Sequence, residues 1–204
     1  MVAARAGVRL GVLLLCASAA AGCASGHVGQ ARVDHLRGDA DWRLVPGVAL
    51  VRQRTPSDCG AAALEMVVRY WLPGAGADVR AALTEVTDSQ GVEAGQLRSV
   101  ARQQGLTAFL VEGAVSDLQH EIDRGRPVLV GLAKVKGQRA VGHYEVVVGL
   151  NAHKQRILTA DPDGGWREIP LAEFLTEWQP TRRLTLVIFP QSQEQGQGVQ
   201  ARGS

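Results

Sequence analysis

The sequence predicts an α+β fold, with an N-terminal helical half packed on a mainly antiparallel sheet. Two observations lead to this class. As far as residue 125, apolar side chains recur mostly at helical spacing. From Pro127 onward, short runs of β-forming residues follow one another between turns that contain Gly, Asn or Pro. Helices first and closely spaced strands later favour this class over alternating βαβ units.

The first 22 residues have the pattern of a secretory signal and are left out of the fold. Arg5 and Arg9 precede the apolar stretch 10–15, and small residues follow. The segment ends in Ala-Ala-Gly-Cys, which resembles the lipobox of bacterial lipoproteins, where cleavage falls before the cysteine and its sulfur is acylated, as with palmitate. We therefore expect a lipid anchor on Cys23. The alternative is an ordinary secretory signal in which this cysteine stands by chance.

Export sets the expected compartment. Of the three cysteines, Cys16 would leave with the signal and Cys23 would carry lipid, so Cys59 alone would keep a free thiol. Outside the cytoplasm an unpaired cysteine is open to oxidation unless something needs its thiol. Ala24 and Ser25 follow the lipidation site, without the aspartate that marks many inner-membrane lipoproteins. We expect an outer-membrane anchor that faces the periplasm of a Gram-negative cell.

Charge and hydropathy narrow the choice of partners. The chain has 22 Lys and Arg against 20 Asp and Glu, and the signal removes two of the basic residues and none of the acidic ones. An electroneutral mature protein gains little from counterion release on a phosphate backbone, so nucleic acid is not expected as a partner. No later apolar run approaches the ~20 residues of a membrane-spanning helix, so membrane contact should come from the lipid.

The length after the signal fits a single domain. Residues 23–43 are rich in Gly, Ala and charged residues without a clear period, and are expected to form a tether. Residues 191–204 are mostly Gln, Gly and Ser, and are expected to be a disordered tail. The folded domain is thus predicted to span residues 44–190.

The first helix of this domain should begin at Cys59. Ser57 or Asp58 can serve as its N-cap, and Pro73 with Gly74 ends it. Four apolar residues share one face of this helix: Leu64, Val67, Val68 and Trp71.

The remaining elements follow in order. We expect helices from about residue 78 and over 94–104, a strand over 106–111, and a short helix from the capping-box pair Ser116 and Gln119 to Gly125. In the second half, strands are expected over 128–133, 144–150, 156–160 and 183–189, with one helix over 171–178 between the last two.

Cys59 is placed where a thiol can be activated. A free cysteine has a pKa near ~8.5 and attacks as the thiolate, and the unpaired N–H groups and dipole at a helix start favour that charge. Gln53 lies just upstream, so its amide could join the Cys59 backbone N–H in holding the oxyanion formed on an attacked carbonyl. The alternatives are a small buried cysteine and a solvated loop glutamine.

A thiolate also needs a base, and the chain has five histidines. Four are expected to be solvated: His27 and His35 in the tether, His120 on a helix and His153 in a turn. His143 opens a strand and can be aimed, so its neutral imidazole can take the proton of Cys59. Asp161 ends the next strand and would meet His143 if the two strands form a hairpin around 151–155. Asp161 could instead cap a turn before Asp-Gly-Gly.

These stretches resemble the peptidase family C39, the papain-like cysteine peptidase domain found at the N-terminus of bacteriocin ABC transporters. The matching text is QRTPSDCGAAALEMVVRYW, then G-x-E-x-x-x-L from Gly91, GHYEVVVG, and ADPDGGWREIPLAEFLTEW. The resemblance covers about residues 45–190 and implies a papain-like fold. It makes Cys59 the nucleophile, His143 the base, Asp161 the orienting acid and Gln53 the oxyanion donor. No cofactor and no metal are expected.

The resemblance also implies an activity. Family members trim leader peptides, commonly after Gly-Gly or Gly-Ala, on the cytoplasmic side of a transporter. In this sequence we recognise no transporter or ATPase segment, and we expect the signal to direct the chain out of the cytoplasm. We therefore expect a lipid-anchored cysteine peptidase acting on a peptide or protein, with small residues such as Gly-Gly beside the cut. The alternatives are a module that holds Gly-rich peptides without cutting them, and an acyltransferase with the same site.

Overall fold

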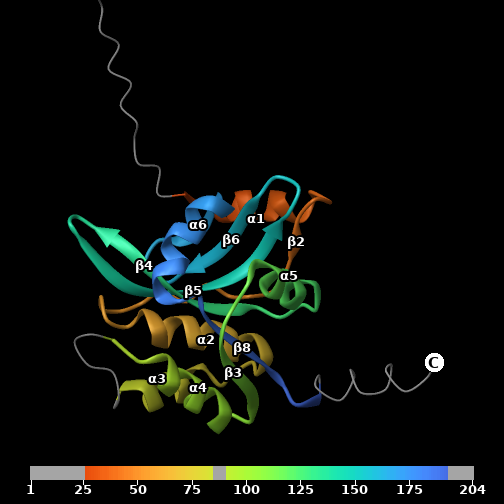
Figure 1. The fold of residues 1–204 in the computed structure, drawn as a ribbon. Helices are drawn as coiled ribbons and strands as arrows, with labels where there is room; N and C mark the ends of the chain where they lie inside the picture. The colour runs from red at the N-terminus through yellow and green to blue at the C-terminus, as the bar shows by residue number, and fades with distance from the viewer. Residues whose placement is uncertain (1–25, 85–90, 193–204) are drawn as a thin grey trace, which may run out of the picture.

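The computed structural model describes residues 26–84 and 91–192 (Figure 1). The expected signal peptide 1–22, the lipidation site Cys23 and residues 193–204 of the expected tail lie outside these ranges. Within them, no helix combines the length and the apolar character needed to cross a membrane.

Helices come mainly first and strands mainly second, as predicted. The helices are α1 (Gln30–Arg37), α2 (Cys59–Trp71), α3 (Gly76–Thr84), α4 (Ala94–Gln103), α5 (Val115–Asp123), α6 (Leu171–Trp178) and the short 3-10 helix η1 (Gln179–Thr181). The strands are β1 (His27–Val28), β2 (Arg43–Leu44), β3 (Leu106–Glu112), β4 (Val128–Lys136), β5 (Arg139–Asn151), β6 (Arg156–Asp161), β7 (Gly165–Pro170) and β8 (Leu184–Pro190).

The strands of the described chain form one antiparallel sheet. Its order is β1-β7-β6-β5-β4-β8-β3, and β2 pairs with β5 beside this path. In Figure 1, α2, α3 and α4 gather on one side of β4–β6, and α1 and α6 lie on the other. The predicted fold class, helices packed on a mainly antiparallel sheet, is therefore confirmed.

The predicted start of α2 at Cys59 agrees with the structure. All ten residues from Cys59 to Val68 are buried, instead of a single stripe, because α2 contacts β5 on one side and α3 and α4 on others. A helix that is apolar all round belongs in an interior. Asp58 stands at the N-cap, but its carboxylate accepts the backbone N–H of Arg54 at 3.1 Å and pairs with Arg80 of α3.

The expected tether is wrong for residues 26–43, which fold onto the sheet. β1 pairs antiparallel with β7, and Val33 and Leu36 of α1 are buried in the core. Arg32 of α1 donates to both carboxylate oxygens of Glu168 in β7, at 2.8 and 3.1 Å. Little in the sequence indicates this helix, because eight residues with two buried side chains form a very short apolar stripe.

Two local features also differ from the sequence prediction. The sequence analysis did not predict strand β7. The Asp-Gly-Gly run before it forms a turn, as expected, but this turn is tight and leads directly into a buried strand. The predicted capping box of Ser116 and Gln119 is wrong. α5 begins at Val115, because the Asp117 carboxylate accepts the backbone N–H of Ala114 at 2.7 Å.

Candidate active site

Cys59 and His143 face one cleft, between the start of α2 and the hairpin of β4 and β5. Its volume is about 950 Å³. The residues that line it are Pro56, Ser57, Cys59, Gly91, Val92, Glu93, Gly131, Leu132, Ala140, Val141, Gly142, His143, Tyr144, Thr181 and Leu184. Glycine and short aliphatic side chains make up much of this wall, so a peptide backbone can approach Cys59 closely.

Gly60 keeps the start of α2 close to the cleft wall. A Cβ added at Gly60 would overlap Val92 and lie 3.1 Å from the Tyr144 ring. Glycine at this position therefore lets the helix start, and with it Cys59, pack directly against both walls.

Cys59 is 6% exposed, at the first residue of α2. Burial raises the pKa of the Cys59 thiol, but other effects outweigh it. These are a hydrogen bond with the His143 side chain, the charge of that ring, and the backbone N–H groups of Tyr144 and Gly60. The net result is a pKa below that of an ordinary thiol, as expected at a helix start beside a cation.

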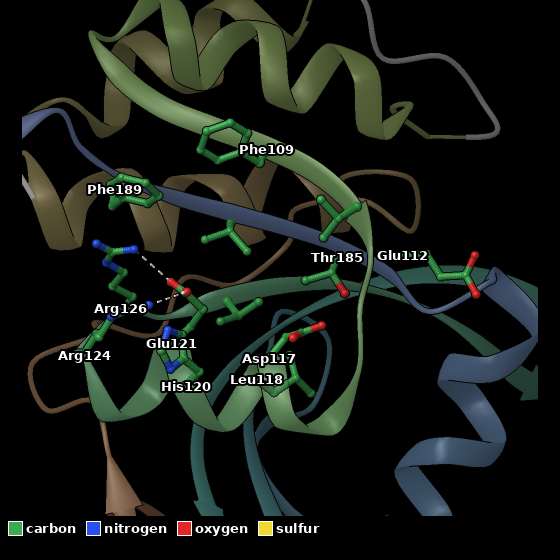
Figure 2. A pocket seen from close by; sticks show the side chains of 13 residues that line it. Phe109, Glu112, Asp117, Leu118, His120, Glu121, Arg124, Arg126, Thr185 and Phe189 are labelled. Carbon is green, nitrogen blue, oxygen red and sulfur yellow. Dashed lines mark hydrogen bonds and ion pairs between the residues drawn. The ribbon is translucent and has the colours of Figure 1, made fainter. Parts of the chain in front are cut away.

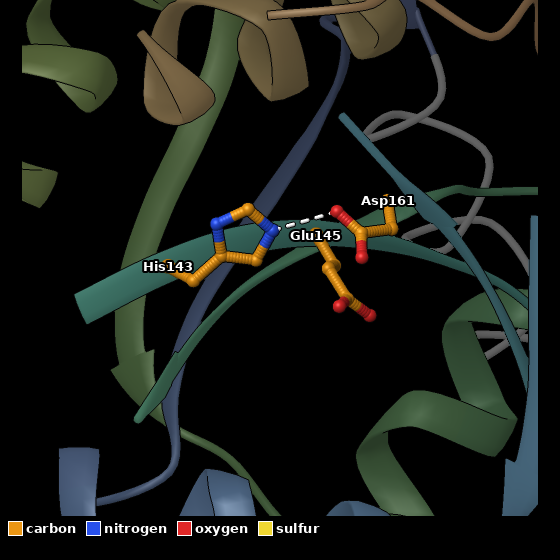
Figure 3. A group of neighbouring side chains, drawn as sticks. All are labelled: His143, Glu145 and Asp161. Carbon is orange, nitrogen blue, oxygen red and sulfur yellow. Dashed lines mark hydrogen bonds and ion pairs between the residues drawn. The ribbon is translucent and has the colours of Figure 1, made fainter. Parts of the chain in front are cut away.

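His143 contacts Asp161 on its other side. Its Nε2 lies 2.7 Å from Asp161 Oδ1 (Figure 3), which leaves Nδ1 for the thiol. The contact arises from the predicted hairpin: β5 pairs with β6 around Asn151, so both side chains lie at the same end. Burial lowers the pKa of His143, but hydrogen bonds to Asp161 and Cys59 and the charges of Asp161 and Glu145 raise it to about 9.

Asp161 serves in two contacts at once. Its Oδ1 accepts His143 Nε2–H and also the backbone N–H of Asp163 at 2.8 Å, so it both contacts the imidazole and caps the turn. Burial raises the pKa of Asp161, but the hydrogen bond and charge of His143, followed by the charge of Lys134, hold it well below its usual range. Asp161 therefore remains a carboxylate at neutral pH.

These pKa directions change one detail of the sequence-based expectation. We expected a neutral imidazole that would take the proton of Cys59. With its pKa raised to about 9, His143 is an imidazolium near neutral pH, and its charge and hydrogen bond lower the pKa of the Cys59 thiol beside it. The proton that a leaving group would need is thus already on His143.

Gln53 is held by its backbone at the turn that follows Asp161. Its N–H donates to the carbonyl of Pro162, the residue after Asp161, at 3.1 Å. Its side-chain Oε1 is buried and accepts no hydrogen bond within residues 26–84 and 91–192. Buried amides are usually paired. The structure therefore brings Gln53 beside the Asp161 turn with one end of its amide unengaged.

Arg80 of α3, which the sequence analysis did not single out, braces the start of α2. Its guanidinium pairs with Asp58 and with Glu65, and donates to the carbonyl of Arg52 at 3.2 Å. These partners lie before and after Cys59 along the chain, so Arg80 ties the approaching segment to the helix. A single arginine in a short helix carries no local pattern that could have revealed this role.

A buried cluster of charges lies behind His143. Glu145 is fully buried; the ammonium of Lys134 contacts its carboxylate and lies 3.6 Å from Asp161 Oδ2. Arg167 Nη1 lies 3.6 Å from Glu145 Oε1. Each buried carboxylate thus has a cation beside it, as buried charges require.

The same cluster contains the group of described residues best spaced for a metal ion. Ligand atoms of His143, Glu145 and Asp161 lie within 4.8 Å of one another (Figure 3). Lys134 and Arg167 already neutralise the two carboxylates, and His143 Nε2 is engaged with Asp161. A metal ion would have to displace these partners, so we assign none.

A second cavity, of about 520 Å³, lies between β3, β8 and α5, apart from this site (Figure 2). Phe109 of the outer strand is 43% exposed there. The guanidinium of Arg126 stacks 3.8 Å from the Phe189 ring centre and donates to Glu121 at 3.2 Å. The lining holds no cysteine, and its buried acid is already paired, so this cavity offers no thiol comparable to Cys59.

Comparison with known proteins identifies the family. The model of the Peptidase C39 family matches residues 48–193. This chain belongs to the peptidase C39 family. No curated protein matches it significantly. The match begins at residue 48, so β1, α1 and β2 lie outside it.

Solved structures agree with this C39 assignment. The peptidase domain of Streptococcus ComA, described as a bi-functional ABC transporter involved in a quorum sensing pathway, is similar with 26% identity and a TM-score of 0.56, over 71% of this chain and 100% of that one. A double glycine motif protease from an AMS/PCAT transporter, solved in complex with the leader peptide, has 24% identity and a TM-score of 0.54 over 71% of this chain and 92% of its own.

A third similar structure has a different source. A C39-like peptidase from Bacillus anthracis has 15% identity and a TM-score of 0.58, over 72% of this chain and 97% of its own. The predicted papain-like C39 fold is confirmed by these neighbours.

Proposed function

We propose that this protein is a cysteine peptidase in which Cys59 is the nucleophile. The observation that carries the proposal is the chain of contacts Cys59–His143–Asp161, with a lowered pKa at the thiol and a raised pKa at the imidazole. A nucleophile bonded to a base, which a third group orients, is the general arrangement of covalent catalysis at carbonyl groups. Membership of the C39 family supports the same chemistry.

We propose the following reaction, which the contacts among Cys59, His143 and Asp161 support. The Cys59 thiolate attacks the peptide carbonyl, and negative charge develops on the carbonyl oxygen. The Cys59 backbone N–H and the Gln53 amide donate to this oxyanion. His143 then protonates the leaving amine through Nδ1, while Asp161 keeps the Nε2–H side of the ring in place. Water, deprotonated by the now neutral His143, releases the acyl group from Cys59.

We propose small residues, with Gly-Gly as the leading case, on the acyl side of the cut bond. The cleft beside Cys59 is lined by Gly91, Val92 and Tyr144, and the helix start packs closely against the last two. A bulky side chain next to the reacting carbonyl would meet these walls. The similar double glycine motif protease, solved with a leader peptide, supports this substrate class.

A pair of matched peptide substrates tests the proposal. One carries Gly-Gly before the expected cut and the other Val-Val, and products are identified by mass spectrometry with wild type and with Cys59→Ala. We expect cleavage after Gly-Gly that depends on Cys59, and little after Val-Val. Binding of the peptide by both proteins without cutting would instead identify a binding module. Products joined to an added amine would identify an acyltransferase.

We also propose that the chain is anchored to a bacterial envelope by lipid on Cys23. The Ala-Ala-Gly-Cys sequence at the end of the N-terminal apolar stretch supports this. Expression in a Gram-negative cell should give a membrane-bound protein that Cys23→Ala releases from the membrane fraction, with a mass change for lipid only in wild type. Equal partition of the two proteins would contradict the anchor.

A further inference from the structure

His27 is in a different place from the one expected. We expected a solvated side chain in a tether, but its Nε2 lies 3.0 Å from Asp161 Oδ2, and the side chain is 27% exposed. Asp161 is the carboxylate whose other oxygen contacts His143. The residue comes from β1, which lies outside the region that matches the family.

Backbone pairing fixes where His27 lies. Residue 27 stands opposite Arg167 in the β1–β7 pair, and the carbonyl of Gly26 accepts the backbone N–H of Glu168 at 2.8 Å. The ion pair between Arg32 and Glu168 fastens α1, which follows directly, to the same strand. His27 is therefore held beside Asp161 by the pairing of residues 26–28 with β7 and by the attachment of α1 to the same strand.

The turn after Asp161 is shaped to receive the imidazole. A Cβ added at Gly164 would overlap the His27 ring. Because the φ angle of Gly164 is not positive, the backbone itself would accept alanine there. The glycine thus serves to leave space for the ring, which provides a way to displace His27 without changing it.

Each carboxylate oxygen of Asp161 has its own hydrogen-bond partners. Oδ1 faces His143 and the backbone N–H of Asp163, and Oδ2 faces His27, with the Lys134 ammonium farther away at 3.6 Å. A carboxylate held at one oxygen can still rotate about its last torsion, which is broad. A donor on the second oxygen fixes the plane of the carboxylate, and with it the direction in which the His143 ring points.

The neighbouring charges are engaged with one another. Lys134 contacts Glu145, Lys136 pairs with Asp163 at 3.0 Å, and Arg167 donates to Glu177 at 2.7 and 2.8 Å. Glu173 of α6 lies 3.3 Å from Arg167 as well. Removal of His27 would thus leave Oδ2 with Lys134, at longer range, as its nearest cation.

We propose that His27 is a positioning residue of the peptidase site, supplied by the N-terminal segment that precedes the family match. It acts through Asp161 on His143 and does not touch the reacting atoms. The inference rests on the proposed cysteine peptidase function. It makes β1 and α1 an integral part of the active enzyme, close in sequence to the expected anchor at Cys23.

Two independent changes test the role with the full chain. His27→Ala removes the donor, and Gly164→Ala displaces it. Both should lower kcat on the order of tenfold with little change in KM, because misplacing a reacting group costs rate and leaves ground-state binding intact. His27→Gln, whose amide can donate from a similar distance, should restore most of kcat. His35→Ala in α1 and Gly95→Ala in α4, where a Cβ meets no atom within 4 Å, are the controls.

A readout that needs no peptidase activity accompanies the kinetics. Mass spectrometry of the Cys59 peptide follows the rate at which iodoacetamide alkylates this cysteine. The alkylation rate should rise with pH, and the midpoint of this rise should lie at a higher pH in His27→Ala and Gly164→Ala than in wild type. The reason is that a less firmly held His143 stabilises the thiolate less. If wild type cut no peptide, the proposed function would fall, while this comparison would still test His27.

The kinetic and alkylation results either support or overturn the role of His27. Unchanged kcat and an unchanged alkylation midpoint in both variants would overturn the inference. A His27→Gln protein as impaired as His27→Ala, with thermal unfolding at the wild-type temperature, would also overturn it, since the hydrogen bond would then not be the feature that matters. Loss in both variants with recovery by Gln supports it.

Discussion

The two sides of the His143 ring are built differently. On the cleft side the ring meets one thiol, among glycine and short aliphatic side chains. On the other side lies a dense set of buried charges: Asp161, Glu145, Lys134 and Arg167. On the cleft side the reaction therefore depends on one thiol that no other group can replace. On the rear side several charged groups together hold the His143 ring and raise its pKa. Changes at the cleft should abolish the reaction, and changes at the rear should reduce it.

The largest effect is expected at the nucleophile. Cys59→Ala should lower kcat at least ~10⁴-fold, because removal of a nucleophile leaves only the oxyanion donors and binding. Steady-state cleavage of the Gly-Gly peptide measures it, and unchanged peptide affinity is the control. Residual cleavage within tenfold of wild type would break the contrast between the two sides.

Gln53→Ala should have the next largest effect. Loss of one oxyanion donor lowers kcat by ~10²–10³, with KM nearly unchanged, because the donor acts on charge that exists only in the transition state. Gln53→Glu is the matched change of similar size and should be at least as damaging, since a carboxylate repels the oxyanion. If Gln53→Ala lowered only stability, Gln53 would be a structural residue.

Asp161→Asn tests the rear side through pH. In wild type, kcat/KM should fall on the acid side as the Cys59 thiolate takes a proton, and the midpoint of this limb should lie below the pKa of an ordinary thiol. On the alkaline side kcat/KM should fall near pH 9, as His143 loses its proton. Without the Asp161 charge the pKa of His143 drops, so the alkaline limb should move down toward ~6.5 and activity at pH 7 should fall about fourfold. An alkaline limb that stays near 9 would contradict this account.

The smallest effect on chemistry is expected at Lys134. Lys134→Met leaves the fully buried Glu145 with one cation fewer, which should lower the free energy of unfolding by about 3 kcal/mol. Lys136→Met, which removes an exposed pair with Asp163, is the matched control and should change it by less than ~1 kcal/mol. Denaturant unfolding measures both. Equal values would show that burial does not distinguish the two lysines.

The sequence predicted the side of the site that depends on local pattern. Cys59 at a helix start and the hairpin that joins His143 to Asp161 are encoded by short-range spacing: an apolar helix period after Asp58, and two β-rich runs separated by a five-residue turn. Such signals are contained within windows of about twenty residues, so they can be read without the tertiary structure.

The sequence could not predict contacts made by side chains distant along the chain. His27 reaches Asp161 across 134 positions, and Arg80 reaches Asp58 across 22. Isolated histidines and arginines have no period of their own. The short β1 and α1 were missed for the same reason, since their stability comes from pairing with β7 rather than from local propensity.

The pH dependence of Cys59 alkylation in wild type and His143→Ala tests the central claim most directly. We expect Cys59 in wild type to react with iodoacetamide with a midpoint below pH 8.5, and the His143→Ala protein to react with a midpoint near the ordinary value of ~8.5. Peptide mapping ensures that only alkylation of Cys59 is measured. A wild-type midpoint near 8.5 that His143→Ala leaves unchanged would contradict an activated thiolate, and with it the account of this site.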